Sequence, residues 1–125
     1  MNHNNKDLLS NKSFRFGVDS YRLCTGLMKT KNEFVLSRQL MRSASAVGAL
    51  YAESEYAQSK ADFVNKLAIA RKECNESRYW IAIMLELGLL DSAAAQTIQS
   101  QANELMRLLT ASIKTAQSNL SMRND

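Results

Sequence analysis

Hydrophobic and polar positions follow the period of an α-helix over most of this chain. In two long segments, apolar or small side chains recur at alternating spacings of four and three residues, which places them on one side of a helix. Repeats of this kind favour nearly parallel packing of neighbouring helices, at about +20°. The two stripes are Phe63, Leu67, Ala70, Cys74, Ser77, Ile81 and Met84, and Ile98, Ala102, Leu105, Leu109, Ser112, Ala116 and Leu120.

Breaks between the helices are few, because the 125 residues include no proline and four glycines. Ser59, followed three residues later by Asp62, predicts a helix N-terminus, and Gly88 is a natural C-terminal cap. Asp91 or Ser92 can cap the next helix. These signals predict helices over residues 12–29, 33–56, 59–87 and 92–120.

Short links make consecutive helices antiparallel neighbours. The predicted fold class is therefore all-α, an antiparallel up-down-up-down four-helix bundle. We expect the bundle to span residues 12–121, with a flexible N-terminal arm at 1–11 and a flexible tail at 122–125.

The first and third predicted helices carry more apolar surface than the core of one bundle can bury. The first helix has one group that we assign to the core, formed by Phe14, Val18, Tyr21 and Met28, and a second on its nearly opposite side. We expect the surplus stripes to contact another subunit, although a thick core or the N-terminal arm could also cover them. The expected subunit interface comprises Phe16, Leu23, Leu27, Ile69, Trp80, Ile83 and Leu87.

The second helix has a side of small residues opposite its core side. Ser45, Ala49 and Ala52 lie there and would let another backbone or a ligand come close. The flanking Arg38 and Arg42 can bind anions or pair with carboxylates, and pairing is the commoner outcome for Arg42. Its core side is formed by Leu36, Leu40, Ala44 and Val47.

Positive charge is concentrated in the first half of the chain. Residues 1–50 have eight Lys and Arg against three acids, and residues 51–125 have eight against nine, for a net charge of +4. Such an asymmetry is compatible with an anionic partner such as nucleic acid or with a solvated surface. Two basic stripes, one on the first helix and one on the third, could follow a phosphate backbone. The expected nucleic-acid contacts are Arg15, Arg22, Lys29, Arg38, Arg42, Lys60, Arg71 and Arg78.

Residues for catalysis or metal binding are scarce. The sole histidine, His3, falls in the expected arm, and neither a P-loop nor a GxGxxG motif occurs. Cys24 and Cys74 are isolated, which is typical of core thiols in a reducing compartment. No apolar run reaches the ~20 residues needed to span a bilayer, and no export signal is visible. We expect a cytoplasmic protein without enzymatic activity, metal or cofactor.

The segment QLMRSASAVGALYAESEYAQSKADFVNKLAIARKECNESRYWI resembles the signature region of the bacterial four-helix-bundle proteins encoded in 23S rRNA intervening sequences, also called the S23 family. The resemblance extends from about Phe14 to Leu120. Its most specific part is R-S-x-(S/T)-x-(I/V)-G-A from Arg42 onward, followed by SKADF, KLAIA and E-x-x-E-x-x-Y-W. Leu50 departs from the pattern, because many members have Asn at this turn.

This resemblance implies an antiparallel four-helix bundle that assembles into a ring-like homo-oligomer, a pentamer, with no known catalysis. It also implies RNA or DNA binding, and similarity to the accessory proteins of diversity-generating retroelements, which partner a reverse transcriptase. Two functions therefore compete: a nucleic-acid-binding oligomer with little sequence specificity, and a protein-interaction scaffold that does not bind nucleic acid directly. We expect the first if both basic stripes share one continuous surface of the assembly, and the second if acids such as Glu73 and Glu76 neutralise them.

Overall fold

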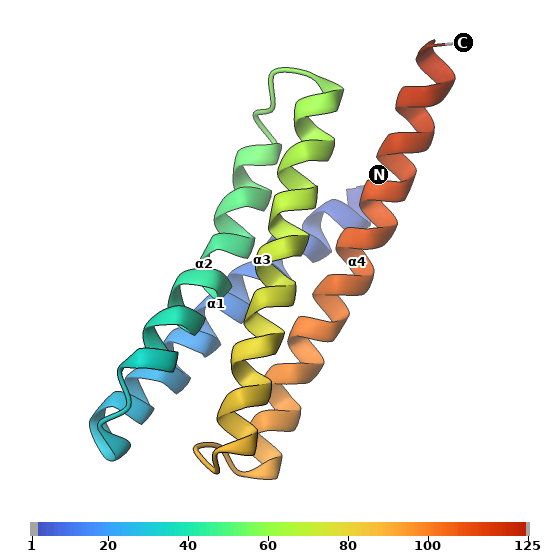
Figure 1. Cartoon of the computed structure of the whole chain (residues 1–125). Coiled ribbons are helices and arrows are strands. Elements are labelled where there is room, and N and C mark those ends of the chain that lie inside the picture. Colours follow the sequence, from blue (N-terminus) through green and yellow to red (C-terminus); the bar gives the residue numbers. More distant parts are fainter. Residues whose placement is uncertain (1–2, 125) are drawn as a thin grey trace.

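Four long α-helices make up the part of the chain that the structure describes, and local caps mark several of their ends. The computed structural model describes the backbone of residues 3–124 and the side chains of residues 8–120, and this part of the chain contains no β-strand (Figure 1). The helices are α1 (His3–Lys31), α2 (Val35–Ser54), α3 (Lys60–Glu86) and α4 (Ser92–Asn124).

The link between α1 and α2 is closed by two local devices. Asn32 adopts a left-handed backbone conformation with φ 52°, which asparagine tolerates better than most residues. The carboxylate of Glu33 accepts hydrogen bonds from the backbone N–H groups of Leu36 (3.2 Å) and Ser37 (2.7 Å). Glu33 thus satisfies donors that the first turn of α2 would otherwise leave free.

Side chains cap α3 and α4 as predicted. The hydroxyl of Ser59 accepts the backbone N–H of Asp62 at 3.0 Å, and the Asp62 carboxylate accepts the N–H of Gln58 at 3.2 Å. The first bond is that of a capping box, whereas the return bond from Asp62 reaches the residue before the N-cap instead of the N-cap itself. Asp91 caps α4 by accepting the N–H of Ala94 at 2.8 Å.

Gly88 ends α3, as predicted, because it adopts a positive φ of 72°. Its N–H donates to the carbonyl of Leu85, and the N–H of Leu89 donates to the carbonyl of Met84. These two bonds form a Schellman motif, in which glycine is preferred because it has no Cβ.

The helices pack in the cyclic order α1–α2–α3–α4, and each contacts its sequence neighbours. The contact between α1 and α4 closes the bundle and is the smallest of the four, while α1 and α3 are diagonal. Figure 1 shows α1 crossing obliquely behind α2 and α3. The predicted all-α, antiparallel four-helix bundle is therefore confirmed.

The core follows the predicted stripes on three of the helices. On α3 and α4 all the stripe residues from Leu67 to Met84 and from Ile98 to Ser112 are buried, and at the ends of the two stripes Phe63, Ala116 and Leu120 are half-buried. On α2 the buried residues include Leu40, Ala44 and Val47.

The assignment of faces on α1 was wrong. Phe14 and Tyr21, assigned to the core, keep 66% and 56% of their surface exposed, whereas Phe16 and Leu27, assigned to the subunit interface, are buried in the core of this chain. Half of the buried side of α1 consists of small side chains, which a hydrophobic pattern weights too lightly. Its members are Leu9, Ser13, Phe16, Ser20, Cys24 and Leu27.

Both ends of the bundle extend beyond their predicted limits. The expected flexible arm at 1–11 is helical from His3, and Leu9 is fully buried, so an apolar contact holds this first part of α1 on the core. At the other end α4 continues to Asn124 and includes most of the expected tail at 122–125. Residues 1, 2 and 125 lie outside the described residues.

Candidate functional site

The two predicted basic stripes lie on diagonal helices and do not form one continuous surface within the chain. Arg15, Arg22 and Lys29 are exposed on α1, and Arg15 lies 3.8 Å from the carboxylate of Asp19. Arg22 and Lys29 line a hollow at the junction of α1 and α2. The first condition that we set for nucleic-acid binding, a shared surface, is therefore not met by a single copy.

The stripe on α3 divides into two parts. Arg71 and Arg78 point toward α4, where Arg71 donates to the hydroxyl of Thr110 at 3.4 Å and Arg78 to the side-chain oxygen of Asn103 at 3.1 Å. Lys60 instead lines a separate hollow near the other end of α3, together with residues of α2 and α4.

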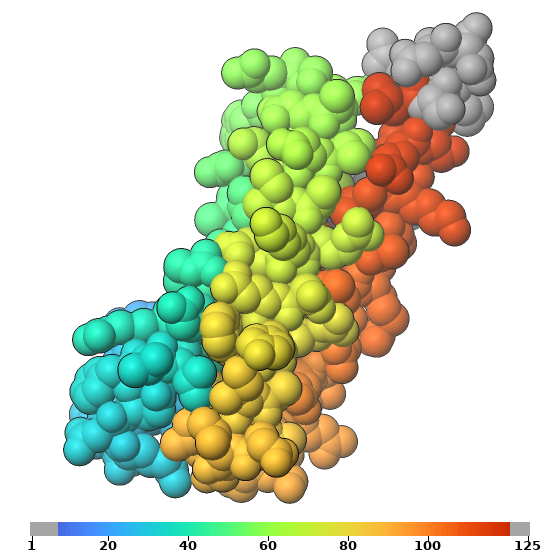
Figure 2. Space-filling view, viewed as in Figure 1, coloured from blue at the N-terminus to red at the C-terminus, as the bar shows by residue number. Residues whose placement is uncertain are grey.

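A third arginine lies beside Arg71 and Arg78 and was not predicted. Arg107 on α4 lines a groove of about 640 Å3 with Arg78, Asn103 and Thr110. We call this surface, together with Arg71, the α3/α4 basic groove. Figure 2 shows α3 and α4 side by side on the face turned toward the viewer. No carboxylate occurs among the described residues that line it. The seven-residue spacing of Arg107 and Lys114 was the signal that could have identified it.

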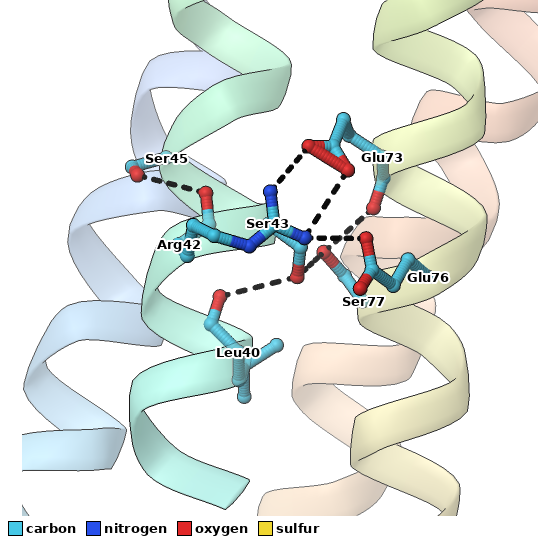
Figure 3. A network of polar contacts seen from close by, with 7 residues as sticks. All are labelled: Leu40, Arg42, Ser43, Ser45, Glu73, Glu76 and Ser77. Carbon is cyan, nitrogen blue, oxygen red and sulfur yellow. Dashed lines mark hydrogen bonds and ion pairs between the residues drawn. The ribbon is translucent and has the colours of Figure 1, made fainter.

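Arg42 is committed to an ion pair and is not a free cation. Its guanidinium crosses from α2 to α3, where it lies 2.8 Å from the Glu73 carboxylate and 2.5 Å from that of Glu76 (Figure 3). These hydrogen bonds raise the pKa of Arg42, and its guanidinium lowers the pKa of Glu76. Arg42 therefore ties two helices together.

A buried pair of hydroxyl groups lies beneath this ion pair. Ser43 and Ser77 are fully buried and hydrogen-bonded at 2.8 Å, and Ser77 also donates to the carbonyl of Glu73 at 3.0 Å. The start of the R-S-x-(S/T) motif thus places consecutive residues in polar contact with α3 (Figure 3). Arg38, the other expected cation of α2, lies over the ring of Phe34, with 5.5 Å between the guanidinium carbon and the ring centroid.

The expected subunit interface is only partly available to a neighbour. Phe16 and Leu27 are core residues, as described above, and Leu23 is half-buried against the core. On α3, Ile69 and Leu87 expose 37% and 63% of their surface. Trp80 and Ile83 are half-buried, so their part in an interface stays a prediction.

An apolar hollow lies between α1 and α2, and we call it the α1/α2 groove. It has a volume of about 700 Å3 and is bounded by Phe14, Val18 and Tyr21 on one side. Its other side is the predicted small-residue face of α2, Ser45, Ala49 and Ala52. The two helices can approach closely here because Gly48 has no Cβ. A Cβ at this position would lie only 3.3 Å from the carbonyl oxygen of Ser13.

Reactive groups are few in the part of the chain that the structure describes. No three His, Cys, Asp or Glu side chains gather there in a way that could hold a metal ion. Burial raises the pKa of both the Cys24 and Cys74 thiols to about 12, so neither is a thiolate at neutral pH. Across the described helices, none combines the length and apolar character required to cross a bilayer.

Comparison with known proteins agrees with this architecture. The family described as 23S rRNA-intervening sequence protein matches residues 6–111. The crystal structure of a protein of unknown function from the S23 ribosomal protein family of Bacteroides thetaiotaomicron superimposes with a TM-score of 0.87 at 36% sequence identity, covering 88% of this chain and 98% of that one. No curated protein matches the chain. Because the family match spans most of the sequence and the same bundle recurs in this relative, the chain belongs to the family of 23S rRNA-intervening sequence proteins.

Proposed function

We propose that this protein is a non-enzymatic, self-associating bundle that binds the phosphate backbone of nucleic acid through the α3/α4 basic groove. The nucleic acid that we propose is RNA. The observation that carries the proposal is that Arg71 and Arg78 donate to uncharged partners and lie beside Arg107. No carboxylate is among the described residues that line the groove. Their charge is therefore not neutralised locally, in contrast to that of Arg42.

The geometry of the groove suits a backbone contact better than base readout. Arg71 and Arg78 are seven residues apart on one helix face, about 10 Å along the axis, so each can reach a different phosphate. Their neutral partners hold the guanidinium groups at the surface without consuming the charge. Contacts of this kind position a nucleic acid and carry no sequence information. The family name refers to intervening sequences of 23S rRNA, which makes structured RNA the first ligand to test.

The test replaces Arg71, Arg78 and Arg107 together by Gln, which keeps helix propensity and removes three charges. Affinity for a structured RNA, measured by fluorescence anisotropy at several salt concentrations, should fall, and the log–log salt slope should become shallower by about 2 to 3. The matched control removes three exposed cations outside the groove, Arg15, Lys31 and Lys72, for the same change in net charge. Equal losses in both triple variants, or none in the first, would show that the groove is not the binding surface.

A specific observation also favours self-association, and with it the scaffold function. Phe14 and Tyr21 expose more than half of their surface beside the small residues of the α1/α2 groove, and α3 exposes Ile69 and Leu87 at another place. Exposed apolar surface of this extent is typical of protein contacts. Two different surfaces on one chain permit head-to-tail contacts, and such contacts form a ring when the rotation between neighbouring subunits closes.

Charge substitutions on the two surfaces test this second proposal. Phe14→Glu and Ile83→Glu should each reduce the mass measured by light scattering while helix content by circular dichroism is unchanged. Phe14→Glu keeps the surface on α3 intact, and Ile83→Glu keeps the α1/α2 groove intact. A mixture of the two variants should therefore form one contact between unlike chains and give a heterodimer. A parent protein that is monomeric at high concentration would exclude self-association and leave the α1/α2 groove to another protein.

A further inference from the structure

A second basic surface differs from the α3/α4 groove because it includes an aromatic ring. At the junction of α1 and α2, a hollow of about 540 Å3 is lined by Arg22, Thr25, Gly26, Met28, Lys29 and Phe34. We call it the Phe34 hollow. Phe34 directly precedes α2 and is 40% exposed. Gly26 also lines the hollow, and a Cβ at this position would meet no atom within 4 Å.

The ring of Phe34 is in contact with the side chain of Arg38. The guanidinium of Arg38 lies over it at 5.5 Å, a cation–π distance, and Arg38 belongs to the first turn of α2. The backbone around Phe34 is also fixed, because the carboxylate of the preceding residue, Glu33, accepts the N–H groups of Leu36 and Ser37. The ring is therefore a preorganised apolar face that a planar group can cover at little cost in conformational entropy.

The electrostatics of the hollow favour an anion next to that ring. Arg22 and Lys29 are seven residues apart on α1, about 10 Å along the axis, and both line the hollow. The acid next to Phe34 in the sequence, Glu33, directs its charge to the N-terminus of α2. The pKa of the Cys24 thiol is raised first by burial and then by the charge of Glu33. No carboxylate is among the described residues that line the hollow.

We propose that the Phe34 hollow binds one unpaired nucleotide, with the base stacked on Phe34 and its phosphate held by Arg22 or Lys29. Aromatic side chains beside basic ones are the usual means of holding single-stranded nucleic acid, because every base has a π-face. The same chemistry would bind a free nucleotide. The inference rests on the proposed nucleic-acid function for its source of ligand and adds a preference for unpaired bases, which phosphate contacts in the α3/α4 basic groove cannot supply.

The test compares Phe34→Leu with the parent protein. Leucine keeps an apolar side chain but has no ring, so affinity for a short single-stranded oligonucleotide should fall about 5- to 150-fold. The salt slope should stay unchanged, since no charge is removed. Phe34→Trp should restore binding. Tyr56→Leu is the matched control, because Tyr56 is an aromatic residue that is 89% exposed outside the hollow.

Two further ligands identify the source and separate this inference from the proposed function. An oligonucleotide of abasic sites should bind the parent as weakly as Phe34→Leu does, and AMP should bind measurably only if a free nucleotide is the ligand. Equal affinity of parent and Phe34→Leu overturns the inference and leaves the α3/α4 basic groove standing. Loss in Phe34→Leu, with full binding by the triple arginine variant, supports the hollow and overturns the groove. A parent that binds no oligonucleotide and no AMP overturns both.

Discussion

A single methyl group added at Gly48 should disturb the packing of α1 on α2. The Cβ of Gly48→Ala would lie 3.3 Å and 3.4 Å from the carbonyl oxygen and carbon of Ser13 and 3.6 Å from the amide nitrogen of Phe14. All three atoms belong to the backbone of α1, so no side chain can rotate to make room. Relief requires α1 to move as a whole by a few tenths of an ångström.

The expected magnitude follows from two opposing effects. Replacing glycine by alanine inside a helix stabilises it by ~0.5–1 kcal/mol. Overpacking a close contact costs about 1–3 kcal/mol. We therefore expect Gly48→Ala to lower the free energy of unfolding by between about zero and 2.5 kcal/mol. The control is Gly26→Ala, also within a helix, where the added Cβ meets nothing within 4 Å. There only the favourable effect applies, and stability should rise by ~0.5–1 kcal/mol.

Urea unfolding followed by circular dichroism measures the difference between the two variants. We expect Gly48→Ala to be less stable than Gly26→Ala by about 1–3 kcal/mol, or roughly 3–10 °C in midpoint temperature for a chain of this size. Protein concentration must be matched, because self-association would add to the apparent stability. An equal gain in both variants would refute the reasoning, since it would mean that α1 and α2 are not in backbone contact at Gly48.

Three further predictions follow from the polar contacts and the thiols. Partial burial alone would raise the pKa of Glu33, but the hydrogen bonds from α2 outweigh burial and lower that pKa. The ionised Glu33 carboxylate therefore stabilises the fold above about pH 4.5, and this contribution is lost in acid. The difference in unfolding free energy between the parent and Glu33→Gln should shrink from pH 7 to pH 3, and a constant difference would contradict this. Arg42→Gln should raise the pKa of Glu76, measured by NMR titration, and cost about 1 kcal/mol of stability because the pair is partly exposed; an unchanged Glu76 titration would mean that the ion pair does not form in solution. Cys24 and Cys74, with pKa values of about 12, should react with a thiol reagent at pH 8 only after unfolding, whereas fast reaction of the folded protein would show that the core opens.

Local patterns were enough to predict the bundle. The stripes on α3 and α4 and the core side of α2 could be read from spacing alone, because in each of them one set of apolar or small residues recurs at the helical period. The caps at Ser59, Gly88 and Asp91 were equally legible, since a cap is a contact between residues only a few positions apart.

The buried face of α1 was decided by tertiary structure. This helix has large apolar side chains on two nearly opposite sides, so its sequence is compatible with either side facing the core. The close approach at Gly48 and the burial of Ser13, Ser20 and Cys24 select the side with the smaller residues. Exposed Phe14 and Tyr21 are the consequence, and they create the α1/α2 groove.

The candidate sites divide in the same way. Arg71 and Arg78 could be predicted as a pair because seven residues return a side chain to the same helix face. That Arg42 meets Glu73 and Glu76, more than 30 positions away, depends on the register of α2 on α3. That Arg107 joins Arg71 and Arg78 depends on the register of α3 on α4. Spacing determines which side chains share a helix face, whereas the charge left on that face is set by the neighbouring helix that packs against it.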